Sequence, residues 1–109
     1  MNEIEYRKRI QSTFDLIENA FEGIDPDVTE CEQSQGALTL LLADRSKCIL
    51  SAQPSIRQLW LALASRGKAY HFNFSEDSAQ WLDDRGEGIE LMGFLRKYFK
   101  DTAGIDLKI

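Results

Sequence analysis

The spacing of apolar residues changes twice along this chain of 109 residues, and these changes constrain its fold more than any other feature. Near the start, apolar residues recur at steps of three and four, on one stripe of a predicted helix: Tyr6, Ile10, Phe14, Ile17 and Phe21. Gly23 and Pro26 end this helix. Helical spacing returns near the other end and stops at Gly104, with one buried face: Leu91, Met92, Leu95, Tyr98 and Phe99. We expect the apolar tail after Gly104 to pack against the domain.

Between these helices the pattern changes to short apolar runs separated by turn residues. It predicts six strands, the last of them short: 29–33, 38–43, 47–52, 59–64, 69–74 and one around Trp81 and Leu82. Sequential strands joined by short turns favour antiparallel pairing. The prediction is an α+β fold, a two-layer α-β sandwich with two terminal helices packed on one face of an antiparallel sheet of about six strands. The other face of the sheet is left open to solvent and partners.

Length and charge narrow the class of protein. A chain of this size suits a single domain spanning residues 1–109. There are 18 Asp and Glu against 13 Lys and Arg, a formal net charge of −5. Such a surface repels phosphate backbones and gives no reason to expect binding to nucleic acid or to an anionic membrane. The partners that remain are cationic: metal ions or a basic patch on another protein.

Cysteine, histidine and the N-terminus indicate where the protein works and what it does not do. Cys31 and Cys48 form no CxxC pair, so we expect reduced thiols in a reducing compartment. No secretion signal, transit peptide or membrane span is visible, which predicts a cytoplasmic protein. His71 is the only histidine, and no nucleophile motif accompanies it. We expect a solvent-facing strand histidine and no enzyme activity.

Carboxylates are the most informative polar residues, and seven of them form the predicted metal site: Asp15, Glu18, Glu22, Asp25, Asp27, Glu30 and Glu32. Three lie on a second stripe of the first helix, two in the following loop, and two on the same side of the next strand. If helix and strand lie side by side, the seven form one ridge of oxygen ligands, which hard cations prefer. The spacing is not that of an EF-hand, so binding would be weak. An ordinary solvated acidic face, or a surface that steers a basic partner, explains the same residues.

A second candidate site surrounds Trp60. Strand alternation points Leu59, Leu61 and Leu63 under the helices, and Trp60 and Ala62 to the open face. An aromatic residue on an exposed sheet, near Arg and Gln, has the composition of an interface hot spot. A tryptophan packed beneath a loop is the alternative interpretation.

Several short stretches form a recognisable set: Gln53, Gln58-Leu59-Trp60-Leu61, Tyr70-His71-Phe72, Trp81 and Asp84-Arg85. With the acidic first helix and the helix–strands–helix order, they resemble the signature of the frataxin family, especially its bacterial branch, over nearly the whole chain. The resemblance implies a frataxin-like domain with a role in making iron–sulfur clusters. It also implies weak binding of Fe2+ and Fe3+ by surface carboxylates. The implied partners are the pyridoxal-phosphate cysteine desulfurase and the iron–sulfur scaffold protein, with modulation of sulfur delivery.

The resemblance also assigns residues. The family's acidic ridge maps onto Glu18, Glu22, Asp25, Asp27, Glu30 and Glu32, and its scaffold-facing tryptophan maps onto Trp60. The implied partner-binding residues are therefore Glu18, Glu22, Gln53, Gln58 and Trp60. The chain departs from the family at Asn19 and Gly23, which thin the ridge, and at Ser51, which stands where an asparagine is usual. Turn positions also differ: Pro54, Gly86 and Gly88.

Three functions remain open at this point. The favoured one is an accessory regulator whose ridge docks on the desulfurase while Trp60 contacts the scaffold. The second is an iron chaperone or store that delivers ferrous iron from the same ridge. The third is an acidic α+β chaperone that holds a client peptide, which would need an exposed apolar groove and usually a dimer. We expect a monomer, with iron-dependent oligomers as an open alternative.

Overall fold

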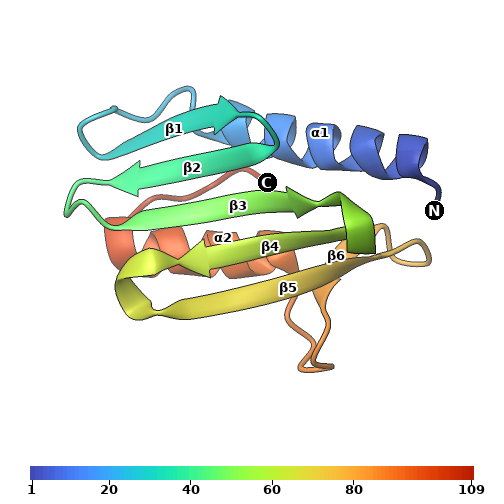
Figure 1. Cartoon of the computed structure of the whole chain (residues 1–109). Helices are drawn as coiled ribbons and strands as arrows, with labels where there is room; N and C mark the ends of the chain where they lie inside the picture. Colours follow the sequence, from blue (N-terminus) through green and yellow to red (C-terminus); the bar gives the residue numbers. More distant parts are fainter.

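Two helices and six strands make up the computed structural model, which describes residues 1–109 (Figure 1). In chain order they are α1 (Glu3–Ala20), β1 (Thr29–Ser34), β2 (Ala37–Leu42), β3 (Lys47–Gln53), β4 (Gln58–Leu63), β5 (Lys68–Ser75), β6 (Gln80–Asp83) and α2 (Leu91–Ala103). The strands form one antiparallel sheet in sequence order, β1-β2-β3-β4-β5-β6. Both helices lie on the same face of this sheet (Figure 1). The predicted two-layer α-β sandwich is confirmed.

The core lies between the sheet and the helices, as strand alternation predicts. Leu59, Leu61 and Leu63 of β4 are buried, whereas Trp60 and Ala62 between them are only partly covered on the open face. Helix stripes cover the inward leucines, with Phe14 and Ile17 of α1 at most 1% exposed. One continuous cluster of 21 buried apolar residues results, so the two layers share a single core.

Capping residues fix where each helix begins and ends. Asn2 caps α1 through its side-chain oxygen, which accepts from the backbone N–H of Glu5 at 2.8 Å. Glu90 caps α2 by accepting from the N–H groups of Met92 and Gly93. Gly104 ends α2 in the left-handed region at φ 66°, and the chain then folds back with Ile105 and Leu107 buried. The predicted packing of the tail is confirmed.

Two long-range hydrogen-bonding centres tie α1 to the sheet. The Tyr6 hydroxyl donates to the carbonyl of Gln58 at 2.6 Å and accepts from the N–H of Gln53 at 2.9 Å. These two residues pair at the end of the β3–β4 ladder. Further along α1, the Thr13 hydroxyl accepts from the indole N–H of Trp81 at 3.0 Å.

No helix is long and apolar enough to cross a membrane.

Candidate functional site

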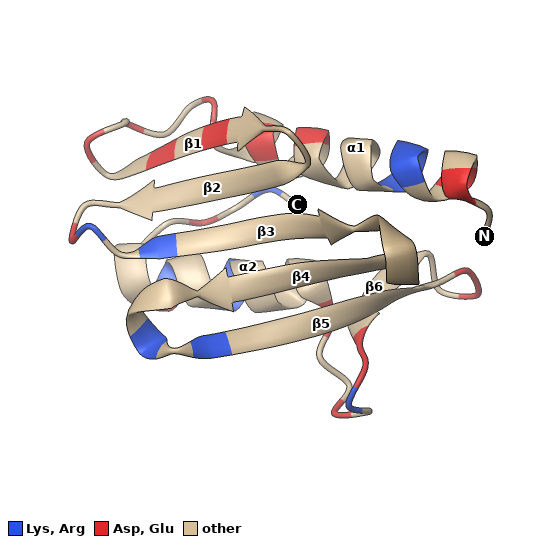
Figure 2. Cartoon of the chain, viewed as in Figure 1, with Lys and Arg blue, Asp and Glu red and all other residues tan.

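The seven predicted carboxylates lie along one edge of the molecule, which we call the acidic ridge: Asp15, Glu18, Glu22, Asp25, Asp27, Glu30 and Glu32. Figure 2 shows the acidic residues on α1, on β1 and in the loop between them. The side chain of Gln11 on α1 donates to Asp15 at 2.8 Å and to Gln33 of β1 at 2.7 Å, which holds helix and strand side by side. All members of the ridge are exposed except Glu18, which is partly buried. The expected adjacency of helix and strand is therefore observed.

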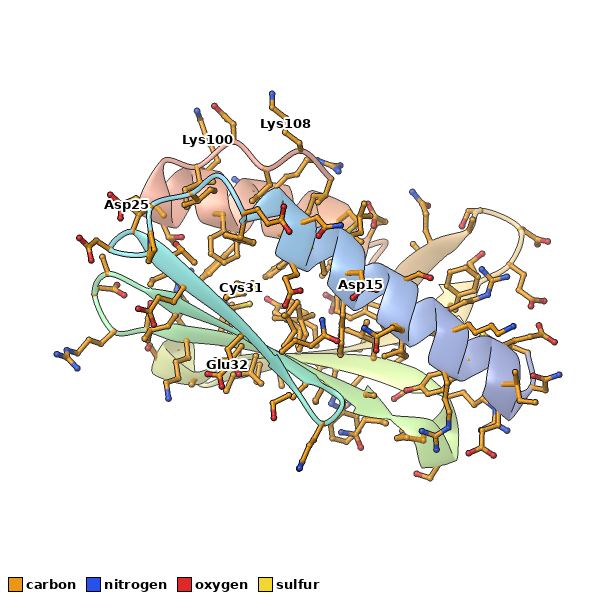
Figure 3. The ribbon with its side chains drawn as sticks, turned by 90° about the horizontal axis from the view of Figure 1, so that it is seen from above. Asp15, Asp25, Cys31, Glu32, Lys100 and Lys108 are labelled. Carbon is orange, nitrogen blue, oxygen red and sulfur yellow. The ribbon has the colours of Figure 1, made fainter.

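The ridge does not form a chelating cluster. Thr29, Cys31 and Gln33 face α1, so Glu30 and Glu32 project from the other side of β1 (Figure 3). The strand thus separates its own two carboxylates from those of the helix. No group of three or more His, Cys, Asp or Glu side chains is placed to hold one metal ion. A cation at the ridge would meet few carboxylates at a time and would keep much of its water.

None of the seven carboxylates has an internal counter-charge. The side-chain ion pairs of the chain lie elsewhere, as Arg7–Glu3, Lys97–Asp101 and Lys100–Asp106, and the contact of His71 with Asp84 also lies away from the ridge. Asp25 instead accepts from the backbone N–H of Asp27 at 2.9 Å, which shapes the loop without neutralising it. The ridge therefore presents like charges that no cation of the chain neutralises, and their attraction for a cationic partner weakens as salt rises.

A cysteine lies beneath the ridge, on the side of β1 that faces α1 (Figure 3). Burial, together with the negative charge of Glu18, raises the pKa of the Cys31 thiol to about 11. Burial alone raises the pKa of Cys48 to about 12. Both thiols are therefore protonated at neutral pH. A soft metal binds the thiolate and not the thiol, so neither cysteine is a ready ligand. The oxygen atoms of the ridge are its available ligands.

The second predicted site is held in place by a network on the open face of β4 and β5. Trp60 stacks on His71, with ring centroids 4.1 Å apart and 12° between the planes. The Gln58 side chain accepts from the Trp60 indole N–H at 2.8 Å and donates to Asn73 and Asp84, each at 3.2 Å. His71 Nδ1 lies 3.7 Å from the Asp84 carboxylate. We call these five residues the Trp60 surface.

Sequence reasoning found Gln58 and Trp60 but did not assign His71, Asn73 and Asp84 to the site. The register could have found two of them, because β4 pairs Trp60 with His71 and Gln58 with Asn73. The histidine lies on the open face as expected, yet its ring is covered by the indole, leaving its side chain 36% exposed. Gln53, the other predicted polar contact, pairs with Gln58 across the β3–β4 ladder, and its side chain makes no hydrogen bond within the chain.

The ridge and the Trp60 surface border one continuous open face. Glu30 and Glu32 lie on edge strand β1, and Trp60 lies three strands away on β4. Between them β2 and β3 present partly buried apolar side chains, among them Leu41 and Ile49. One broad surface therefore offers negative charge at one side and an aromatic anchor at the other.

Comparison with known proteins identifies relatives of this chain in sequence and in fold. A family model described as a frataxin-like domain matches residues 1–105. The iron-sulfur cluster assembly protein CyaY of Pseudomonas fluorescens (strain Pf0-1) is 32% identical over 106 residues, which cover 97% of this chain and 93% of that protein. Frataxin from Psychromonas ingrahamii has the same fold, with a TM-score of 0.86 at 24% identity over 98% of this chain and 96% of that one. Trimeric frataxin from the yeast Saccharomyces cerevisiae, complexed with ferrous iron, matches with a TM-score of 0.64 at 21% identity over 96% of this chain and 88% of its own.

Proposed function

This chain belongs to the frataxin family, and from that premise we propose that it is a non-catalytic accessory protein of iron–sulfur cluster assembly. In this role it binds a cysteine desulfurase and the scaffold protein and modulates the delivery of sulfur between them. The observation that carries the proposal is the acidic ridge, whose seven carboxylates share one edge with no internal counter-charge. The protein acts in the cytoplasm and as a monomer.

The ridge is the docking surface for a basic patch on the desulfurase. Complementary charge raises the rate of association and fixes the orientation of the two proteins. Glu18 of α1 and Glu22 just after it lie on the helix side of the edge, and Glu30 and Glu32 project from the open face. A basic patch that wraps around β1 can therefore contact both sets. Because most of these carboxylates are exposed, their contribution falls as salt rises.

The Trp60 surface contacts the scaffold protein. Hydrogen bonding by Gln58 and stacking on His71 hold the indole before any partner arrives. A pre-positioned aromatic side chain loses little rotamer freedom on binding, which is typical of hot-spot residues. With the ridge along one edge of the sheet and Trp60 on the open face, the protein fills a groove between the two larger partners. Occupying this groove alters sulfur transfer although the chain itself does no chemistry.

Iron is the cargo or signal, bound weakly as Fe2+ or Fe3+ by carboxylate oxygens of the ridge. The donor atoms fit a hard cation, and the absence of a three-ligand cluster fits low affinity. Iron and the desulfurase compete for the same carboxylates, which makes docking sensitive to iron. Delivery of ferrous iron to the scaffold is a second candidate function, since it uses the same exposed oxygens.

Association with a cysteine desulfurase, measured at rising salt, tests the docking step. The double variant Glu18→Lys plus Glu22→Lys reverses two charges of the ridge. Glu76→Lys plus Asp77→Lys makes the same change of charge in the β5–β6 turn, away from the ridge. We expect slower association for wild type as salt rises and loss of binding in the ridge variant, with the turn variant close to wild type. Binding that ignores salt, or equal losses in both variants, contradicts the proposal.

Anaerobic titration calorimetry with Fe2+ tests the iron step separately. Weak binding that disappears in Glu18→Lys plus Glu22→Lys supports the ridge as the iron site. If Fe2+ gives no heat while the desulfurase still binds, iron delivery is excluded and the docking role stands.

A further inference from the structure

A groove separate from both surfaces runs beside α1, between that helix, the β5–β6 hairpin, the start of α2 and the tail. Its volume is about 680 Å³, within the range of small-molecule sites. Four of the α1 residues that line it recur at steps of four and three: Glu5, Arg9, Ser12 and Leu16. This stripe and the ridge residues Asp15 and Glu18 occupy opposite flanks of the helix, with the buried stripe between them. A ligand in the groove would therefore not touch the acidic ridge.

The groove carries positive charge in an otherwise acidic protein. Lys8, Arg9 and Arg96 line it, and neither Lys8 nor Arg9 pairs with a carboxylate. The Arg9 guanidinium lies over the Phe74 ring at 4.2 Å, and its Nε is buried without an acceptor. Arg96 donates only to the main-chain oxygen of Ile109, at 2.7 Å. The Arg9 guanidinium has no carboxylate partner within the chain, so an anion in the groove would supply the charged hydrogen bond that the protein does not.

The two acidic residues of the groove leave this charge in place. Glu90 uses both carboxylate oxygens to cap α2, accepting from Met92 N at 2.6 Å and from Gly93 N at 3.0 Å. The N-terminus of α2 is thereby already occupied and is not the anion site. Glu5 lies on the exposed surface of α1. Two cations without a partner, Lys8 and Arg9, thus face one carboxylate that is free to interact, that of Glu5.

The remaining walls are mostly apolar, with Ser12, Thr13 and Gln80 as the polar exceptions. Leu16 is 48% exposed on α1, and Met92 and Ile109 lie across the groove from it. The floor is Trp81, whose indole N–H is held by Thr13. A fully hydrated inorganic anion would gain nothing from these walls, whereas an apolar body would remove them from water.

We propose that this groove binds a small organic anion, a carboxylate joined to an apolar body, with the charged group at Arg9 and the apolar part against Leu16 and Trp81. The arrangement combines an unpaired guanidinium, one apolar trough and a volume suited to such a molecule. The proposal does not depend on the role in cluster assembly, since it uses neither the ridge nor the Trp60 surface.

An NMR titration of the full-length, nitrogen-15-labelled protein with octanoate tests the proposal. The chain has two tryptophans, so two indole N–H signals report separately on the groove floor at Trp81 and on the opposite face at Trp60. We expect a saturable shift of the Trp81 signal with the Trp60 signal unchanged. Octanol, which lacks the charge, and acetate, which lacks the apolar body, should each bind at least about tenfold more weakly.

Variants separate a built site from general charge attraction. Arg9→Gln should weaken octanoate binding by about tenfold. Arg66→Gln is the matched control, because that guanidinium also lies over an aromatic ring, Tyr98 at 5.3 Å, but outside the groove. Leu16→Asp changes an exposed residue and should also abolish binding without unfolding the chain. An unmoved Trp81 signal, octanol binding equal to octanoate, or equal losses in Arg9→Gln and Arg66→Gln would each overturn the proposal.

Discussion

Replacing Tyr6 by phenylalanine removes one oxygen atom that joins α1 to the two strands carrying Gln53 and Gln58. The side chain is 1% exposed, and its hydroxyl makes two hydrogen bonds to main-chain groups, at 2.6 and 2.9 Å. A net contribution of about 1 kcal/mol for each bond predicts a loss of about 2 kcal/mol in the free energy of unfolding. For a domain of this size the melting temperature should fall by about 10 °C.

Urea unfolding followed by circular dichroism measures this loss, with Tyr70→Phe as the matched control. Tyr70 packs against Phe94 but its hydroxyl makes no hydrogen bond within the chain, so its removal should change stability by less than about 0.5 kcal/mol. Equal effects of the two substitutions would refute the assignment of Tyr6 as the link between α1 and the sheet.

The same variant also has a signature at high pH. Burial raises the pKa of the Tyr6 hydroxyl, opposed in part by the N–H of Gln53. Because the folded state holds this proton more tightly than the unfolded chain, the stabilisation is complete below the ordinary tyrosine pKa of about 10 and is lost as pH rises further. The stability of Tyr6→Phe should therefore decline less steeply above about pH 10 than that of wild type.

Two further predictions concern the ridge and the end of α2. Glu18→Gln should lower the pKa of Cys31 and so speed its alkylation by iodoacetamide at about pH 8; an unchanged rate would mean that Glu18 does not act on this thiol. Gly104→Ala should cost about 1 kcal/mol in urea unfolding, because its φ of 66° disfavours a side chain. Gly23→Ala, at a position with open space and no positive φ, should be neutral, and equal costs at both glycines would contradict the role of Gly104.

Much of the fold could be predicted because the apolar spacing and the residues that end each element indicate the same helices and strands. Apolar spacing predicted both helices and all strands, and the structure forms the first hairpin turn at Gln35–Gly36, where both residues have positive φ. Gly104 marked the end of α2. The assignment of ridge and Trp60 residues to iron and to partners stays a prediction, and the placement of Glu30, Glu32 and Trp60 on the open face follows from strand alternation.

What the sequence could not reveal depends on contacts between distant segments. Asp84, just after β6, reaches the Trp60 surface because its backbone N–H donates to the carbonyl of His71 at 2.8 Å. Arg9 meets Phe74 only when α1 crosses the sheet beside β5. No local pattern encodes either contact, so the full network around Trp60 and the cationic groove emerge from the three-dimensional structure alone.

A heteronuclear NMR titration with Fe2+, followed by the cysteine desulfurase, tests the central claim most directly. Fe2+ should perturb backbone signals along residues 15–32 and spare the basic turns at Arg45 and Arg66. Addition of the desulfurase should then displace the iron from the same residues. Perturbations that fall mainly on the basic turns, or footprints of Fe2+ and of the desulfurase that do not overlap, would contradict the claim that the acidic ridge binds both.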